Sequence, residues 1–143
     1  MKNVSKFAIY LLAIVLLVAL LTPATGTAAA SKSAKTSKPF SYNVNKQIHK
    51  SLPTFRFAVK GTYDGSDYHT KTITVTQNNG QKLIQKISFV EAESYEKTNL
   101  IFEDMNFDGY LDFRVMMFMP AGPNVPYHYY LWDAKTSKFV KNK

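Results

Sequence analysis

The residues of this chain whose types and spacing best suit a chemical task lie in the segment 104–112, which reads Asp-Met-Asn-Phe-Asp-Gly-Tyr-Leu-Asp. Oxygen-bearing side chains stand at every second position, a glycine follows them, and another carboxylate closes the run. Calcium takes about six to eight oxygen ligands, and a chain supplies several of them only by curling tightly around the ion. Gly109 permits the sharp backbone turn that a side chain would obstruct. The spacing therefore predicts a calcium site formed by the side chains of Asp104, Asn106, Asp108 and Asp112 and by the backbone carbonyl of Tyr110.

This pattern differs from an EF-hand at its end. An EF-hand loop closes with a bidentate Glu at its twelfth position and lies between two helices. Counted from Asp104, that position is Val115, and the residues around it have the character of a strand. The missing ligand would come from water, from Glu103 or from a distant segment. The alternative interpretation is a polar turn without metal, because Asn-Phe-Asp-Gly also suits a turn.

The N-terminal region predicts export. Two lysines precede an apolar run over 7–21, and small residues follow at 27–30. This is the order of a secretory signal peptide, so we expect residues 1–30 to be a helical signal segment, cleaved after Ala30 or retained as an anchor. A retained segment would be the only attachment to a membrane. The Lys/Ser-rich residues 31–45 are predicted to be a flexible tether, and 46–143 the folded domain of a secreted or cell-envelope protein.

The positive net charge of the chain indicates which classes of partner it could bind. The full chain has a net charge of +8, and without Lys2 and Lys6 it has 16 basic and 10 acidic residues, a net charge of +6. A basic surface attracts anionic wall polymers or acidic lipid. The alternative is a basic surface that is only solvated. Nucleic acid is not expected as a partner of an exported protein. The chain has no cysteine, so no disulfide stabilises it, and a bound metal would partly compensate.

Alternation of apolar and polar residues predicts strands rather than helices. Strands are expected over 55–63, 69–77, 82–90, 100–102, 113–119, 127–132 and 139–140. Asn79-Gly80 indicates a hairpin turn, and 91–99 is expected to be a loop or one short helical turn. Regular turn spacing and 14% aromatic residues favour an all-β fold, a small antiparallel sandwich or barrel with the calcium loop between two strands.

The same alternation predicts which side chains face the core. In the first strand Phe55, Phe57 and Val59 share a face. In 69–77 the four threonines share one face and the two aliphatic residues the other. In 82–90 the predicted pattern places Leu83, Ile87 and Phe89 together, with Ile84 opposite. The strand over 113–119 is apolar on both faces except at Arg114, so it is expected to be central in its sheet.

The sequence does not indicate an enzyme. His49, His69 and His128 are scattered over three segments, no cysteine is present, and Ser66 lacks the Gly-x-Ser-x-Gly turn of a nucleophile. Aromatic residues near the C-terminus instead suggest a binding surface. The residues predicted for it are Tyr127, Tyr129, Tyr130 and Trp132. Alternation places them on two faces, of which one must be core.

The segment 100–139 resembles a family of small exported bacterial β-proteins. The resemblance lies in Asp104 to Asp112, the apolar strand that follows, the Pro/Gly loop 120–126, the aromatic strand 127–132 and the motif Asp-x-x-Thr-x-Lys-Phe at 133–139. The loop is also similar to those of FG-GAP and integrin-type propeller blades. Some members of the small family are periplasmic inhibitors of lysozyme-like enzymes that act as immunity proteins and bind calcium in this loop.

Together these features predict an exported calcium-binding β-domain that acts as a binding module at the cell envelope. Its expected partner is an envelope protein or an anionic wall polymer. The resemblance implies an alternative, an inhibitor of a lysozyme-like cell-wall hydrolase. A further alternative is a membrane-anchored enzyme accessory protein.

Overall fold

The computed structural model describes residues 36–77 and 80–142. The secondary-structure elements within these ranges are nine β-strands. The first sheet consists of β1 (Lys38–Lys46), β2 (Phe55–Tyr63), β3 (Tyr68–Gln77) and β4 (Lys82–Ser88), with β5 (Glu93–Ser94) beside β3. The second sheet consists of β6 (Leu100–Glu103), β7 (Asp112–Met116), β8 (Tyr127–Asp133) and β9 (Lys138–Lys141). All pairings are antiparallel, so the all-β prediction is confirmed.

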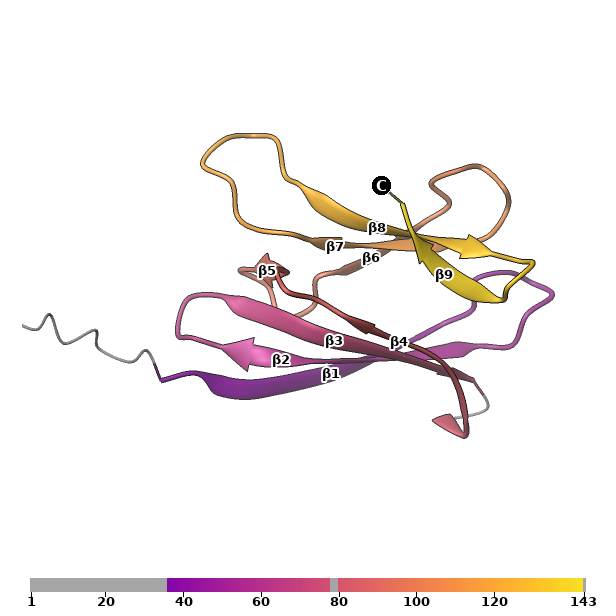
Figure 1. Ribbon diagram of the computed structural model, residues 1–143, viewed down its shortest axis with the longest axis horizontal. Helices are drawn as coiled ribbons and strands as arrows, with labels where there is room; N and C mark the ends of the chain where they lie inside the picture. The colour runs from indigo at the N-terminus through magenta and orange to yellow at the C-terminus, as the bar shows by residue number, and fades with distance from the viewer. Residues whose placement is uncertain (1–35, 78–79, 143) are drawn as a thin grey trace, which may run out of the picture. The chain divides into compact units, whose positions relative to one another are not determined.

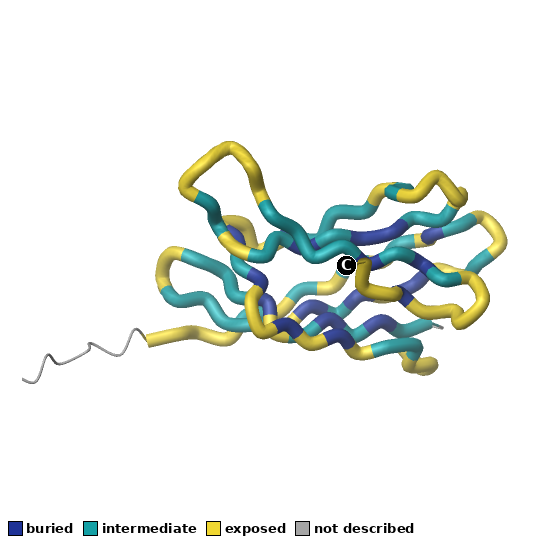
Figure 2. Tube along the Cα trace, turned by 45° about the horizontal axis from the view of Figure 1, so that its top comes forward, coloured by how far each residue is buried: buried dark blue, intermediate teal, exposed yellow. Residues whose placement is uncertain are grey.

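The two sheets form two layers that share one core (Figure 1). Phe57 of β2 contacts Phe113 of β7 at 5.9 Å and Phe139 of β9 at 5.6 Å between ring centroids. The predicted inner face of β2, with Phe55 and Val59, is fully buried. Figure 2 shows buried stretches along the strands and exposed turns. Aromatic rings that meet edge to face between the layers therefore hold the sandwich together.

The domain begins earlier than the sequence predicted. Residues 38–45, assigned to the flexible tether, belong to β1, which pairs with β2 along all nine of its residues. Phe40, Tyr42 and Val44 alternate along β1 and pack against the core. Burial of these three side chains on one face of β1 offsets the conformational entropy that is lost when the strand is ordered, although its other face is polar. The signal segment 1–30 and residues 31–35 lie outside the described residues.

Two β-bulges reverse the predicted facing of two side chains. Lys71 has no partner between the pairs Gly61–Thr70 and Lys60–Thr72, and this extra residue turns Thr70 into the core at 1% exposure. Ile84 is the extra residue in β4, and as a result Leu83 is 63% exposed. A bulge shifts the side-chain alternation by one residue. The predicted facing was therefore wrong for Thr70 and for Leu83, which each lie next to a bulge.

The segment 91–99, expected as a loop or a helical turn, contains the short strand β5 and ends in a buried polar contact. The hydroxyl of Tyr42 donates to Oδ1 of Asn99 at 3.1 Å and accepts from the Asn99 backbone N–H at 3.3 Å. Asn99 is 7% exposed, and its amide also donates to the Thr70 hydroxyl at 3.4 Å. These hydrogen bonds tie β1 and β3 to the residue that precedes β6. The expected hairpin at Asn79-Gly80 falls partly outside the described residues.

We expect Tyr42 to titrate far above an ordinary tyrosine, because burial raises its pKa from 10.0 to about 12. The neutral hydroxyl stabilises the fold fully below pH 10, and this contribution is lost as the pH rises through about 12. Tyr42→Phe should remove the high-pH step from a tyrosinate absorbance titration and destabilise the domain by about 1–3 kcal/mol, since it leaves buried Asn99 without its partner. Tyr95→Phe, at a side chain 66% exposed, should keep the high-pH step and the stability of the unaltered protein.

Candidate metal site

The segment predicted to bind calcium connects β6 to β7, directly between two strands that pair with each other. Glu103 ends β6 opposite Asp112, the first residue of β7. Gly109 has a φ of 88° and Phe107 a φ of 60°, so the loop passes twice through the left-handed region. The glycine is suited to that conformation, whereas the exposed phenylalanine adopts it at a steric cost. The backbone of the loop is therefore held in a specific shape.

Side-chain oxygens inside the loop hold that shape. Both Oδ1 of Asp104, at 3.1 Å, and Oδ1 of Asn106, at 3.3 Å, accept a hydrogen bond from the Asp108 backbone N–H. The other carboxylate oxygen of Asp104 accepts from the Gly109 N–H at 3.0 Å, and Asp108 accepts from the Tyr110 N–H at 2.9 Å. Two oxygens that share one N–H donor must converge, so the chain curls around these side chains as the spacing predicted.

Asp112 anchors the loop from below the surface. Its carboxylate is fully buried, and its two oxygens accept from the Trp132 N–H of β8 at 2.8 Å and from the Met105 N–H of the loop at 3.0 Å. Burial raises the pKa of this carboxyl group, and the nearby charges of Asp108 and Asp104 raise it further. The two backbone donors oppose that effect. Asp112 therefore joins the loop to the second sheet.

The donor chemistry of the loop suits a hard cation. The side-chain oxygens of Asp104, Asn106 and Asp108 accept backbone N–H groups of the loop, and the Asn106 amide also donates to Oδ2 of Asp108 at 2.8 Å. An oxygen that accepts one N–H keeps a second lone pair. Glu103, one candidate for the missing ligand, instead pairs with Arg114 at 3.3 Å. Within residues 36–77 and 80–142, no three His, Cys, Asp or Glu side chains gather closely enough to hold a metal. An ion here would therefore need the Asn106 amide oxygen, the Tyr110 carbonyl and water as well.

The predicted aromatic surface divides between the core and the exterior. Tyr130 and Trp132 are 7% and 4% exposed, so they are core residues and the prediction that they contact a partner was wrong. Tyr130 stacks on Phe113 at 4.9 Å, and Trp132 meets Phe139 at 5.1 Å. A strand presents alternate side chains to opposite faces, so Tyr130 and Trp132 could not share a surface with Tyr127 and Tyr129.

The outer face of the second sheet carries the remaining tyrosines. Tyr127 and Tyr129 are half-buried there, with their ring centroids 6.1 Å apart. Arg114, which pairs with Tyr129 across the sheet, places its guanidinium 4.7 Å from the centroid of Tyr127. Tyr127 and Met116 also line a hollow of about 300 Å³. The role of Arg114 was not predicted, although alternation within 113–119 already places it on this face.

His69 is the only histidine of the described chain held by two carboxylate groups within ion-pair distance. Its Nε2 lies 3.3 Å from Asp64 and its Nδ1 lies 3.3 Å from Glu93. Asp64 also accepts hydrogen bonds from the backbone N–H and hydroxyl of Ser66, both at 3.0 Å. The histidine thus joins the β2–β3 turn to β5.

Comparisons of this chain with protein-family models, with curated proteins and with solved structures found no match. The resemblance to exported bacterial β-proteins therefore stays a prediction that rests on the residues of 100–139. Among the residues that the structure describes, no helix is long and apolar enough to cross a membrane.

Proposed function

We propose that this protein is an exported β-domain that binds calcium in the loop 104–112 and acts as a binding module at the cell envelope. The observation that carries the proposal is the loop itself. The side-chain oxygens of Asp104 and Asn106 already converge on the backbone N–H of Asp108, and Gly109 lies in the left-handed region that the turn requires. A site that is shaped before the ion arrives loses less conformational entropy on binding.

Calcium would act as a structural clip in this loop. Burial raises the pKa of Asp112, and the charges of Asp108 and Asp104 raise it further, so these two carboxylates repel that of Asp112. A divalent cation held by the loop oxygens would offset that repulsion and stabilise the turn between β6 and β7. Extracellular calcium modules bind with dissociation constants of roughly 0.1–1 mM, which suits a structural ion in an exported protein rather than a sensor.

Calcium is expected to raise the melting temperature of the protein, and a chelator is expected to lower it to the metal-free value. At a free calcium concentration of about 100 times the dissociation constant, the stabilisation should be about 2.7 kcal/mol. Asp108→Ala should abolish the response, because it removes a ligand oxygen and the hydrogen bond to the Tyr110 N–H. Differential scanning calorimetry with calcium, with magnesium and with chelator measures all three effects.

Asp133→Ala is the matched control for the loss of an aspartate in a turn. Asp133 accepts from the Lys135 N–H at 2.9 Å and from the Thr136 hydroxyl at 2.8 Å, so it too stabilises a tight turn. The variant should lower the melting temperature somewhat and keep the full calcium response. Coincident melts of the unaltered protein with calcium and with chelator would refute the calcium site.

The outer face of the second sheet is the surface that supports a binding role. Tyr127, Tyr129 and Arg114 combine large apolar area with a fixed cationic group, a composition enriched at the centres of protein interfaces. We therefore propose an envelope protein as the partner on this face. Tyr129→Ser should reduce recovery of that partner from an envelope extract while leaving the calcium response intact. If the captured partner is a lysozyme-like hydrolase, the protein should also suppress its activity.

A further inference from the structure

The open side of the sandwich, where β4 of the first sheet lies beside β9 of the second, carries a shallow groove of about 550 Å³. Its floor is apolar and consists of Ile87, Tyr130 and Phe139, which are 6%, 7% and 1% exposed. Its rim is cationic, because Lys86 of β4 and Lys138 and Lys141 of β9 line it together. Among the described residues that line this groove, none is acidic.

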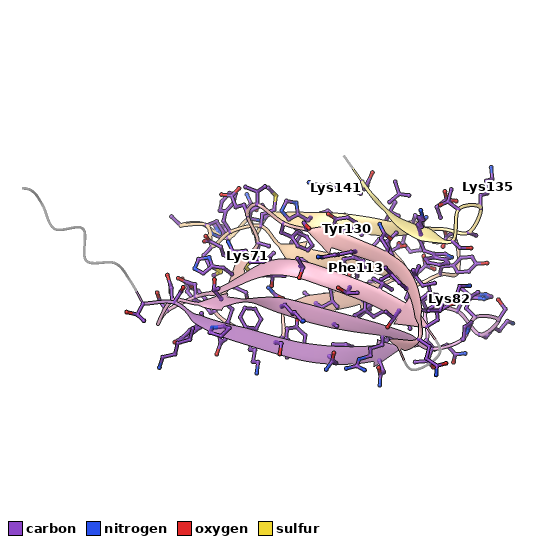
Figure 3. All side chains as sticks on the ribbon, turned by 60° about the horizontal axis from the view of Figure 1, so that its bottom comes forward. Lys71, Lys82, Phe113, Tyr130, Lys135 and Lys141 are labelled. Atoms are coloured by element: carbon purple, nitrogen blue, oxygen red, sulfur yellow. The ribbon has the colours of Figure 1, made fainter. Side chains whose placement is uncertain are left out.

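The ammonium groups of the rim are available to a ligand. Lys86, Lys138 and Lys141 are all exposed, and within the described part of the chain none of them has a carboxylate oxygen at ion-pair distance. Further lysines surround the same side. Figure 3 labels Lys71, Lys82, Lys135 and Lys141 around Tyr130 and Phe113 in one view. A cluster of one sign attracts an anionic partner over a distance of about one Debye length.

From this arrangement we infer that the β4–β9 groove binds a linear phosphate-bearing polymer of the kind that makes bacterial walls anionic. Lys138 and Lys141 are three residues apart on one strand, so their backbones are separated by about 10 Å. An extended ligand that carries repeated charges can contact both ammonium groups at once. A second hollow of about 230 Å³ shares Lys141 and Tyr130 with the groove, but Glu91 also lines it. We therefore place the anionic ligand in the groove between β4 and β9 and not in the second hollow.

The edge of β9 argues against an acidic peptide in the same place. Peptides that bind beside an edge strand add to the sheet through backbone hydrogen bonds. Here the side chain of Gln85 takes those positions, since its amide donates to the Phe139 carbonyl at 2.9 Å and accepts from the Phe139 N–H at 2.9 Å. The ligand must be recognised by side chains instead. Lysines bind phosphate groups as point charges on flexible stems and lack the planar fork by which arginine recognises carboxylates.

The experiment measures binding of inorganic polyphosphate to the full chain by fluorescence anisotropy, at several salt concentrations and in the presence of chelator. The double variant Lys138→Gln/Lys141→Gln is compared with Lys38→Gln/Lys60→Gln, which removes the same charge from exposed positions on β1 and β2. We expect the groove variant to bind at least about tenfold more weakly and the slope of log affinity against log salt to fall by about one per lysine removed. The control should bind like the unaltered protein.

Three outcomes would overturn the inference. Equal weakening in the two double variants would mean that net charge alone attracts the polymer. Equally tight binding of poly-glutamate would mean that the groove does not select phosphate. Failure of polyphosphate to bind the unaltered protein at low salt would exclude the site. Because all measurements are made in chelator, these results are independent of the calcium proposal, which the thermal melts test separately.

Discussion

Asp112→Ala is expected to lower the free energy of unfolding by about 2–5 kcal/mol, even without calcium. The carboxylate is fully buried and accepts from two backbone N–H groups, those of Met105 and Trp132. Each buried donor that loses its partner costs about 1–3 kcal/mol, and a protein interior offers few replacements. The substitution would weaken two attachments at once, because one donor belongs to the loop and the other to β8.

Chemical denaturation in the presence of chelator measures this effect apart from any metal. Asp112→Asn keeps one acceptor oxygen of similar size, so it should lie between the alanine variant and the unaltered protein. Asp108→Ala, measured under the same conditions, removes an exposed aspartate from the same loop and should cost less than Asp112→Ala. If the alanine variant at Asp112 were as stable as the unaltered protein in chelator, the anchoring role would be refuted.

Phe57→Ala should destabilise the domain by about 3–5 kcal/mol, the range for truncating a large aromatic side chain in a core. The ring is fully buried and contacts Phe102 at 4.8 Å, Phe113 at 5.9 Å and Phe139 at 5.6 Å between centroids. These three partners lie on three strands of the opposite sheet. Removal of one ring therefore opens a cavity where the two layers meet.

Equilibrium unfolding in denaturant tests this expectation. The midpoint denaturant concentration should fall while the dependence of the unfolding free energy on denaturant concentration stays unchanged. Phe107→Ala is the matched control, because it deletes the same side chain at a position that is 91% exposed. That variant should change stability by no more than about 0.5 kcal/mol in chelator, as is usual for surface substitutions. A loss below about 1 kcal/mol for Phe57→Ala would contradict a core shared between the two sheets.

The strands themselves could be predicted because alternation is a local signal. The inner face of β2 and the central position of β7 follow directly from which residues are apolar. The bulges at Lys71 and Ile84 could not be predicted in the same way, because a bulge depends on how two strands are aligned. β1 was missed because its apolar residues lie among lysines and polar residues that are also typical of a tether.

In the candidate metal site, too, the local contacts were predictable and the long-range contact was not. The convergence of Asp104, Asn106 and Asp108 was predictable, since hydrogen bonds between residues two to five apart form wherever the chain turns there. The role of Asp112 was only half predictable. Its position in the loop was clear from the spacing, whereas its bond to the Trp132 N–H exists only because β8 lies beside β7.

By itself, the sequence determined an all-β domain, the inner face of β2 and a turn rich in oxygen-bearing side chains at 104–112. All three depend on interactions within a few residues. Only the tertiary structure decided that Tyr130 is core while Tyr129 is not, and that lysines of β4 and β9 share one groove. The physical reason is that burial and side-by-side placement arise between segments far apart in the chain, through strand register and the packing of one sheet on the other.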